Sequence, residues 1–163
     1  MKKRETITKL IGLDTSSSCS GYSIFINGIY SNSGILNYKN EKNSNKRLQE
    51  MCIALLSFLD KENPDIIAIE ITVVTRNAEA QRTLTIILGV VYGWCITHSC
   101  EYVGLRPAEW RSLISKEKKG RKREELKKWS IYKVKELFDL ECNDDQSDAI
   151  LIGQALINQR INL

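Results

Sequence analysis

Four acidic residues far apart in the chain stand where apolar segments begin or end. Asp14 closes the first apolar run, Glu70 comes near the end of a second, and Asp145 and Asp148 lie just before a third. A lone Asp at the end of a strand more often caps a turn, and acids in the first turn of a helix are favoured by the helix dipole. A buried, unpaired carboxylate is costly, however, and the sequence offers no obvious buried Arg or Lys to pair with Asp148.

These four carboxylates define a particular chemistry if they meet. Like charges at short range repel each other, and protonation or bound cations must relieve the repulsion. Sites built only from oxygen ligands suit Mg²⁺ and Mn²⁺, and two such ions stabilise both the attacking and the leaving oxygen of a phosphoryl displacement. The pattern therefore predicts two Mg²⁺ ions per site, with Mn²⁺ as a substitute, held by Asp14, Glu70, Asp145 and Asp148. Whether the neighbouring Asp144 shares this role stays open.

Basic charge is concentrated in one segment of the 163-residue chain. The net charge is +4, and residues 116–128 alone contain eight basic and three acidic side chains. A solvated, lysine-rich helix start would give the same pattern. A local basic patch also favours contact with a polyanion. Together with the acidic site, it predicts hydrolysis of a nucleic-acid phosphodiester.

Apolar periodicity places the four acids on an α/β fold. Asn27-Gly28 is a strong hairpin signal between two strands, so three antiparallel strands come first. The strand that follows the helix over residues 46–62 is expected to pair in parallel with the first strand, which brings Glu70 beside Asp14. The expected strands cover residues 10–14, 22–26, 29–38, 65–71 and 101–105; the expected helical segments are 46–62, 77–98, a turn at 106–111, a helix that ends at 138 and a last helix from 143 or 144.

The helix predicted over residues 77–98 contains two glycines four residues apart. Glycine weakens a helix, so Gly89 and Gly93, which lie near Thr85, need a packing reason. Close approach of another helix would provide it.

Composition indicates one ordinary globular domain over residues 1–163. Apolar residues make up 42% of the chain and charged residues 27%, as in soluble domains. The five cysteines form no CxxC pair, which argues against a zinc site, and His98, the only histidine, is expected either to cap the helix that it ends or to lie in the core. No apolar leader is visible, and the apolar run 86–96 is too short to cross a bilayer. We therefore expect a cytoplasmic protein without a membrane partner.

Three motifs resemble the acidic motifs of the RuvC Holliday junction resolvases, a family in the ribonuclease H-like superfamily. They read I-G-L-D-x6-G-Y-S-I, I-A-I-E and D-Q-S-D-A-I, and they follow the family order over nearly the whole chain. The resemblance implies a ribonuclease H-like fold with a central mixed five-stranded sheet flanked by helices. It also implies that Asp14, Glu70, Asp145 and Asp148 are the catalytic acids of a Mg-dependent endodeoxyribonuclease. Such an enzyme resolves four-way junctions by paired nicks and leaves 5′-phosphate and 3′-hydroxyl ends.

The same resemblance implies partners. Asn77-Ala78 matches a pair in the family, and in ungapped register from there Arg111 and Lys122 fall on lysines that support DNA binding. With the basic segment, the expected DNA-binding residues are Arg76, Asn77, Arg111, Lys116, Lys118, Lys119, Arg121, Lys122 and Arg123. The family acts as a homodimer packed partly through its long helix, so the expected interface includes Thr85, Gly89 and Gly93. The compact chain resembles phage-type members, which would act in the cytoplasm of the bacterial host.

The chain departs from the bacterial pattern at two positions. Thr15-Ser16 replaces Pro-Gly after the first Asp, so this turn is expected to differ. Val73 replaces an aromatic residue placed to stack on a junction base, and such stacking contributes about 1–3 kcal/mol per base. The resemblance with this departure predicts a relaxed sequence preference and a broader range of branched DNA substrates.

Three other functions share some of these features. Another ribonuclease H-like nuclease, acting on RNA or on an RNA–DNA hybrid, would use the same acids and the same metal chemistry. An actin-like phosphate-binding ATPase also has a first hairpin of the type D-T-S-S-S-C-S-G, but that fold needs two domains and a longer chain. A catalytically inactive module that binds branched DNA would have no need for four acids.

Overall fold

The computed structural model describes residues 8–72 and 76–161. Five strands and five helices follow each other in these parts of the chain. The strands are β1 (Lys9–Asp14), β2 (Cys19–Ile26), β3 (Ile29–Asn37), β4 (Ile66–Glu70) and β5 (Glu101–Leu105). The helices are α1 (Ser44–Glu62), α2 (Ala78–Thr97), α3 (Pro107–Ile114), α4 (Arg123–Phe138) and α5 (Asp144–Ile161).

The strands form one mixed sheet in the order β3-β2-β1-β4-β5. The first three strands are antiparallel, and β4 and β5 run parallel to β1. The hairpin between β2 and β3 turns at Asn27 and Gly28, whose φ angles of 52° and 78° are those that a two-residue hairpin of this twist requires. The predicted α/β class and the predicted strand directions are therefore confirmed.

β2 begins three residues earlier than its alternating pattern predicts, because the preceding turn is closed by serine hydroxyls. The Ser16 hydroxyl donates to the carbonyl of Cys19 (2.8 Å) and accepts from its N–H (3.1 Å). The Ser16 N–H in turn donates to the hydroxyl of Ser20 (3.1 Å). This small polar turn stands where the bacterial pattern has Pro-Gly.

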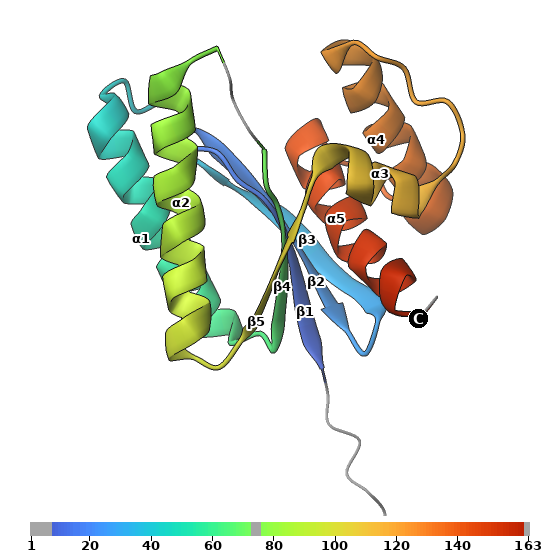
Figure 1. Ribbon diagram of the computed structural model, residues 1–163, viewed down its shortest axis with the longest axis horizontal. Coiled ribbons are helices and arrows are strands. Elements are labelled where there is room, and N and C mark those ends of the chain that lie inside the picture. Colours follow the sequence, from blue (N-terminus) through green and yellow to red (C-terminus); the bar gives the residue numbers. More distant parts are fainter. Residues whose placement is uncertain (1–7, 73–75, 162–163) are drawn as a thin grey trace, which may run out of the picture.

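Helices cover both faces of the sheet (Figure 1). α1 and α2 lie on one face, and α3, α4 and α5 lie on the other. β1, β2 and β4 therefore bury both of their faces, and neighbouring residues on them alternate between two cores, whereas the edge strand β3 is largely exposed. Ile11, Leu13, Ile67 and Ile69 pack with α1 and α2, whereas Leu10, Ile66 and Ala68 pack with α3, α4 and α5.

α5 lies unusually close to β1 and β2 because glycines face it. A Cβ atom at Gly21 would overlap with the carbonyl oxygen of Asp145, and one at Gly12 would overlap with that of Ala149. The buried Ser23 hydroxyl donates to the same Ala149 carbonyl at 2.7 Å. These contacts fix the start of α5 against the end of β1, which is where the first predicted acid lies.

The helices of the described residues include no membrane-spanning segment. Each is either too short or too polar to cross a bilayer. His98 follows α2 as its cap, with the backbone N–H donating to the carbonyl of Trp94 (3.1 Å) and the ring stacked on the Trp94 indole. The prediction of a capping role for His98 is therefore confirmed.

Candidate functional site

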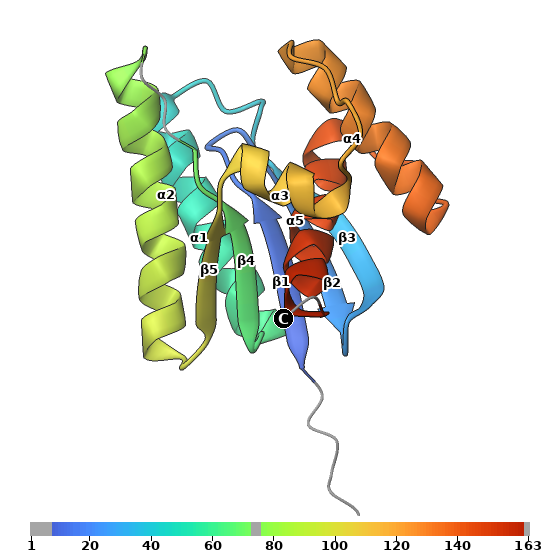
Figure 2. The ribbon, with the colours of Figure 1, turned by 45° about the vertical axis from the view of Figure 1, so that its right-hand side comes forward.

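The four predicted acids lie around one cavity at the end of the sheet. Asp14, Glu70, Asp145 and Asp148 all line a space of about 380 Å³. The carboxyl ends of β1 and β4 and the first turn of α5 meet at the upper end of the molecule in Figure 2. The cavity walls also carry a fifth carboxylate and four cationic side chains: Asp144, Arg111, Arg121, Arg123 and Lys127.

The fold explains why the acids meet. Parallel pairing aligns Leu13 with Ile69, so the next residue of each strand, Asp14 and Glu70, leaves the sheet at the same place. α5 begins with Asn143 as its N-cap, whose side-chain oxygen accepts the N–H of Gln146 at 2.8 Å. Residues three apart lie on one face of a helix, so the start of α5 presents Asp145 and Asp148 to the same cavity.

Burial and mutual repulsion perturb two of these carboxylates. Burial raises the pKa of Asp14 well above its usual range, and the charges of Asp148, Glu70 and Asp145 raise it further. Burial is also the main reason why the pKa of Asp148 rises to about 6. Arg111 opposes both changes, because its guanidinium lowers the pKa of each group. Perturbed carboxyl groups of this kind are typical of functional sites.

Glu70 is held by two hydrogen bonds that the sequence did not indicate. Its two carboxylate oxygens accept from the Thr72 hydroxyl (2.8 Å) and from the indole N–H of Trp110 (2.7 Å). Trp110 is fully buried, and the guanidinium of Arg111 lies 4.5 Å from the centre of its ring. A tryptophan on α3 thus fixes the orientation of the acid on β4 and also contacts Arg111, one of the cations of the cavity wall.

The remaining acids of the cavity contact lysines from other elements. Lys127 on α4 pairs with Asp144 at 2.6 Å, and Lys39, which follows β3, lies 3.8 Å from Asp145. The pKa of Asp144 is lowered, first by the hydrogen bond from Lys127. Neither lysine was among the predicted site residues. Lys127 sits inside the basic segment and could have been singled out by its position, whereas Lys39 gives no signal in the sequence.

The predicted DNA-binding residues fall into two groups. Arg111, Arg121 and Arg123 line the acid cavity. The others lie outside it: Arg76, Lys116, Lys118 and Lys122 are exposed, Lys119 donates to the Ser115 carbonyl, and Asn77 caps α2. Val73, the position that replaces the family aromatic residue, lies outside the described residues.

The glycine pair of α2 faces open space. Nothing among the described residues lies within 4 Å of a Cβ placed on Gly89 or Gly93, and Thr85 is also exposed. The expected close helix partner is therefore not another helix in the described part of this chain. Ile86, Tyr92 and Ile96 are exposed on α2 as well, at 43%, 53% and 64% of their surface.

The acid cavity has the donors that a hard cation prefers, although they are not yet arranged around one point. Among residues 8–72 and 76–161, no three His, Cys, Asp or Glu side chains form a ready-made metal group. The reason is visible in their contacts, since Glu70 and Asp145 are turned toward hydrogen-bond donors or lysines. One oxygen of Asp148, Oδ1, is buried and accepts no hydrogen bond of normal geometry from a described residue, although the Ser130 hydroxyl is close enough to lower the pKa of this group. Carboxylate oxygens with an unsatisfied atom among them fit Mg²⁺ or Mn²⁺.

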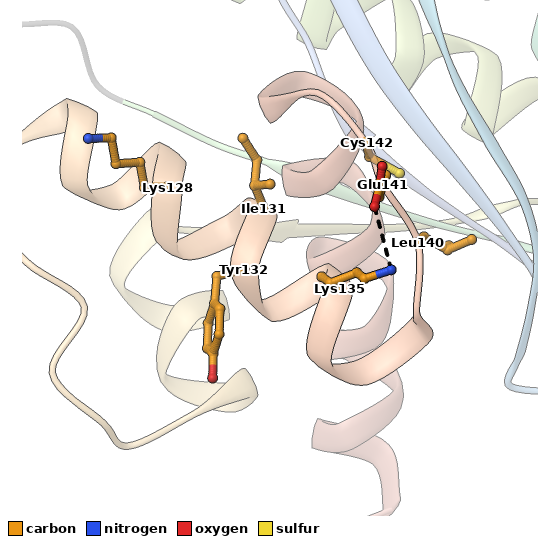
Figure 3. A pocket seen from close by; sticks show the side chains of 7 residues that line it. All are labelled: Lys128, Ile131, Tyr132, Lys135, Leu140, Glu141 and Cys142. Carbon is orange, nitrogen blue, oxygen red and sulfur yellow. Dashed lines mark ion pairs between the residues drawn. The ribbon is translucent and has the colours of Figure 1, made fainter.

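The apolar cavity on the outer side of α4 does not compete with this site. It measures about 490 Å³ and is lined mainly by apolar groups, with Ile131, Tyr132 and Leu140 among them (Figure 3). The carboxylate that lines it, Glu141, pairs with Lys135 at 3.7 Å. A single paired acid provides neither a metal site nor a base.

The sheet order and the helix arrangement define the ribonuclease H-like fold. Within that fold, the chain has the architecture of the RuvC Holliday junction resolvases. The structure of T. thermophilus RuvC in complex with Holliday junction substrate matches with a TM-score of 0.72 and 12% identity, over 95% of this chain and 96% of that chain. The likeness at this identity is one of fold.

Two further structures show the same fold. Fowlpox virus resolvase, in complex with Holliday junction DNA, matches with a TM-score of 0.65 and 14% identity over 94% of this chain and 99% of that chain. The yeast mitochondrial Holliday junction resolvase Ydc2 has a TM-score of 0.65 and 17% identity over 94% and 79%. By sequence, the chain matches no family model and no curated protein.

Proposed function

We propose that this protein is an endonuclease that resolves four-way junctions and cuts other branched DNA by paired nicks. The observation that carries the proposal is the convergence of Asp14, Glu70, Asp145 and Asp148 in one cavity. The neighbours of the same fold strengthen it, because two of them are complexes with Holliday junction DNA. The basic segment at the edge of the cavity supports a polyanionic substrate.

The four carboxylates are proposed to hold two Mg²⁺ ions, with Mn²⁺ as a substitute. When bound, such ions lower the pKa of a water molecule and neutralise charge on the leaving oxygen. The carboxylates themselves must be deprotonated to bind them, so the raised pKa values of Asp14 and Asp148 predict weak cation binding at low pH. The products are proposed to carry 5′-phosphate and 3′-hydroxyl ends.

The other residues of the cavity are proposed to bind and orient. Arg111, Arg121 and Arg123 line the space where a phosphate would lie, and guanidinium groups recognise phosphate oxygens through paired N–H donors. Trp110 fixes the orientation of the Glu70 carboxylate through its indole N–H. Lys116, Lys118, Lys119 and Lys122 extend the cationic surface along the DNA.

A homodimer is proposed to form through the exposed face of α2. Gly89 and Gly93 leave room for a second helix, and Ile86, Tyr92 and Ile96 supply apolar surface around them. Two copies related by a two-fold axis would place two active sites on a four-way junction, which has matching symmetry.

The absence of an aromatic residue at Val73 supports a relaxed sequence preference. The cuts can be mapped on a mobile junction. If all of them fall in one tetranucleotide sequence, the relaxed sequence preference is wrong.

A synthetic four-way junction tests the proposal directly. The wild type should nick it symmetrically with Mg²⁺ and should only bind it without metal. Glu70→Gln and Asp148→Asn should keep binding and lose nicking, whereas Asp139→Asn, which changes an exposed carboxylate on the far end of α4, should cut normally. If the two amide variants cut at the wild-type rate, the four-acid site is wrong. If the protein leaves the junction intact and cuts the RNA strand of an RNA–DNA hybrid, it is a ribonuclease H-like nuclease that acts on RNA.

A further inference from the structure

A second cavity, of about 500 Å³, lies beside the acid site and contains polar groups without partners. Thr15, Arg47 and Asn77 line it, and Arg123 belongs to the walls of both cavities. The Oγ1 atom of Thr15 and the Nε atom of Arg47 are buried, and neither has a hydrogen-bond partner among the described residues. Thr15 is only 8% exposed. Unpaired buried groups are costly and uncommon, so these two indicate that something else binds there.

The two buried groups without partners are able to donate hydrogen bonds. The Arg47 guanidinium can only donate, and the Thr15 hydroxyl can donate. α2 begins at the cavity, and the Asn77 side chain caps the N–H of Ala80 at 3.0 Å. The N–H groups of the first two helical residues therefore have no partner within the helix. A helix N-terminus with free N–H groups favours an anion.

The charge balance of the cavity also favours an anion. Arg47 and Arg123 line it, and Glu79, which is exposed, is the one carboxylate among the described residues of its wall. Arg47 is anchored by a bond from Nη1 to the Glu41 carbonyl (3.0 Å), which holds the guanidinium in place while its Nε stays unpaired. A preorganised arginine of this kind suits a phosphate oxygen.

We propose that this cavity binds a non-scissile phosphate of the same DNA strand whose scissile phosphate lies at the acid site. The inference rests on the proposed function. Thr15 follows Asp14 directly in the chain, and Arg123 lines both cavities, so a strand that occupies one passes the other. The anchored phosphate sets the register of the strand and thereby selects the linkage that reaches the four acids. The polar turn that replaces Pro-Gly is what supplies the hydroxyl.

The first test uses inorganic phosphate and needs no DNA. Amide chemical shifts of the wild type should move at residues 15–17 and 78–80 during a phosphate titration. Thr15→Val and Arg47→Gln should each weaken phosphate binding about tenfold or more, since a hydrogen bond to a charged group is lost. Glu79→Gln should strengthen it. Thr15→Ser keeps the hydroxyl, and Lys46→Gln removes a charge on α1 that does not line the cavity, so both should behave as the wild type. If Thr15→Val and Arg47→Gln bind phosphate as tightly as the wild type in this titration, the assignment is wrong.

The second test asks whether the anion is a DNA phosphate. Junction binding is measured without divalent metal, using junctions in which single linkages are replaced by neutral methylphosphonates. A methylphosphonate at one linkage beside the cut site should weaken junction binding by the wild type about tenfold, as expected for one lost charge-assisted contact. The same methylphosphonate should not weaken junction binding by Arg47→Gln any further, because that variant already lacks the contact. If the wild type binds and nicks the junction but no linkage shows this coupling, the subsite is wrong and the proposed function stands. If the wild type does not bind the junction, the proposed function fails, and the phosphate titration still decides whether the cavity binds an anion.

Discussion

Replacing Asp148 by asparagine should make the metal-free protein more stable while abolishing its nuclease activity. Asp148 is half-buried and lines the acid cavity, its Oδ1 atom is buried without a hydrogen-bond partner among the described residues, and its pKa rises to about 6 from an ordinary value of 3.8. The folded protein therefore holds this proton more tightly than the unfolded chain does. Between those pH values the free energy of unfolding falls as the pH rises, which is the opposite of an ordinary salt-bridged aspartate.

The size of the effect follows from the pKa. One pKa unit corresponds to about 1.4 kcal/mol, so the charged Asp148 reduces the free energy of unfolding by about 3 kcal/mol at pH 8. Asp148→Asn removes that charge and keeps the shape of the side chain. In a domain of this size 1 kcal/mol shifts the melting temperature by about 2–4 °C, so Tm should rise by about 6–12 °C at pH 8. At pH 2.5, where Asp148 is protonated in both the folded and the unfolded state, the variant and the wild type should melt together.

Mg²⁺ provides the matching control. A ligand that binds only the folded state at a hundred times its Kd stabilises it by about 2.7 kcal/mol, so Mg²⁺ should raise the Tm of the wild type and have less effect on Asp148→Asn. Asp139→Asn, at an exposed position, should show neither change. The reasoning is refuted by two results together. Without metal at pH 8, Asp148→Asn would melt at or below the wild-type temperature, and Mg²⁺ would raise the Tm of the variant and of the wild type by the same amount.

Three further substitutions test the supports of the site. Trp110→Phe removes the 2.7 Å hydrogen bond to Glu70, which is worth about 1.5–3 kcal/mol, so single-turnover nicking should slow by about ten- to a hundredfold with little change in junction binding; an unchanged rate would contradict the positioning role. Gly21→Ala places a Cβ against the Asp145 carbonyl, and such overpacking should cost about 1–3 kcal/mol in a melting experiment and slow nicking; full Tm and full rate together would show that α5 can shift freely. Gly93→Ala meets open space in the monomer and should stabilise α2 by up to about 1 kcal/mol, yet it should weaken the homodimer in sedimentation equilibrium; an unchanged dimerisation constant would move the interface elsewhere.

The sheet could be predicted because its strands, turns and pairing directions depend on residues that are close together in the sequence. Asn27-Gly28 sets the hairpin through its own backbone angles, and continuous apolar runs identify the strands that are buried on both faces. The parallel pairing of β1 and β4 follows from the helix between them. Once that pairing is given, the ends of both strands must lie together, which is why Asp14 and Glu70 could be placed beside each other before any coordinates.

The partners of the acids could not be predicted in this way. Trp110, Lys39 and Arg111 come from α3 and from the segment after β3, and their distance from the acids depends on side-chain directions that no periodicity records. Arg111 was assigned to DNA by resemblance, and the structure shows in addition that its charge lowers the pKa of Asp148. The sequence offered no obvious basic partner for this aspartate, and none of the described residues forms an ion pair with it; Arg111 acts on it only through the charge that it carries on α3.

The geometry and the charge of the acid cavity have separate origins in the fold. Its geometry rests on backbone contacts, since α5 touches β1 and β2 where Gly12 and Gly21 lack side chains. Its charge balance rests on long side chains such as Lys127 and Arg111, which reach the acids from α3 and α4. Substitutions at the glycines should therefore displace the acids relative to one another, and substitutions at the cations should change their pKa values and leave their positions intact. The proposed exchange of these cationic partners for metal ions and DNA would therefore need no movement of the sheet.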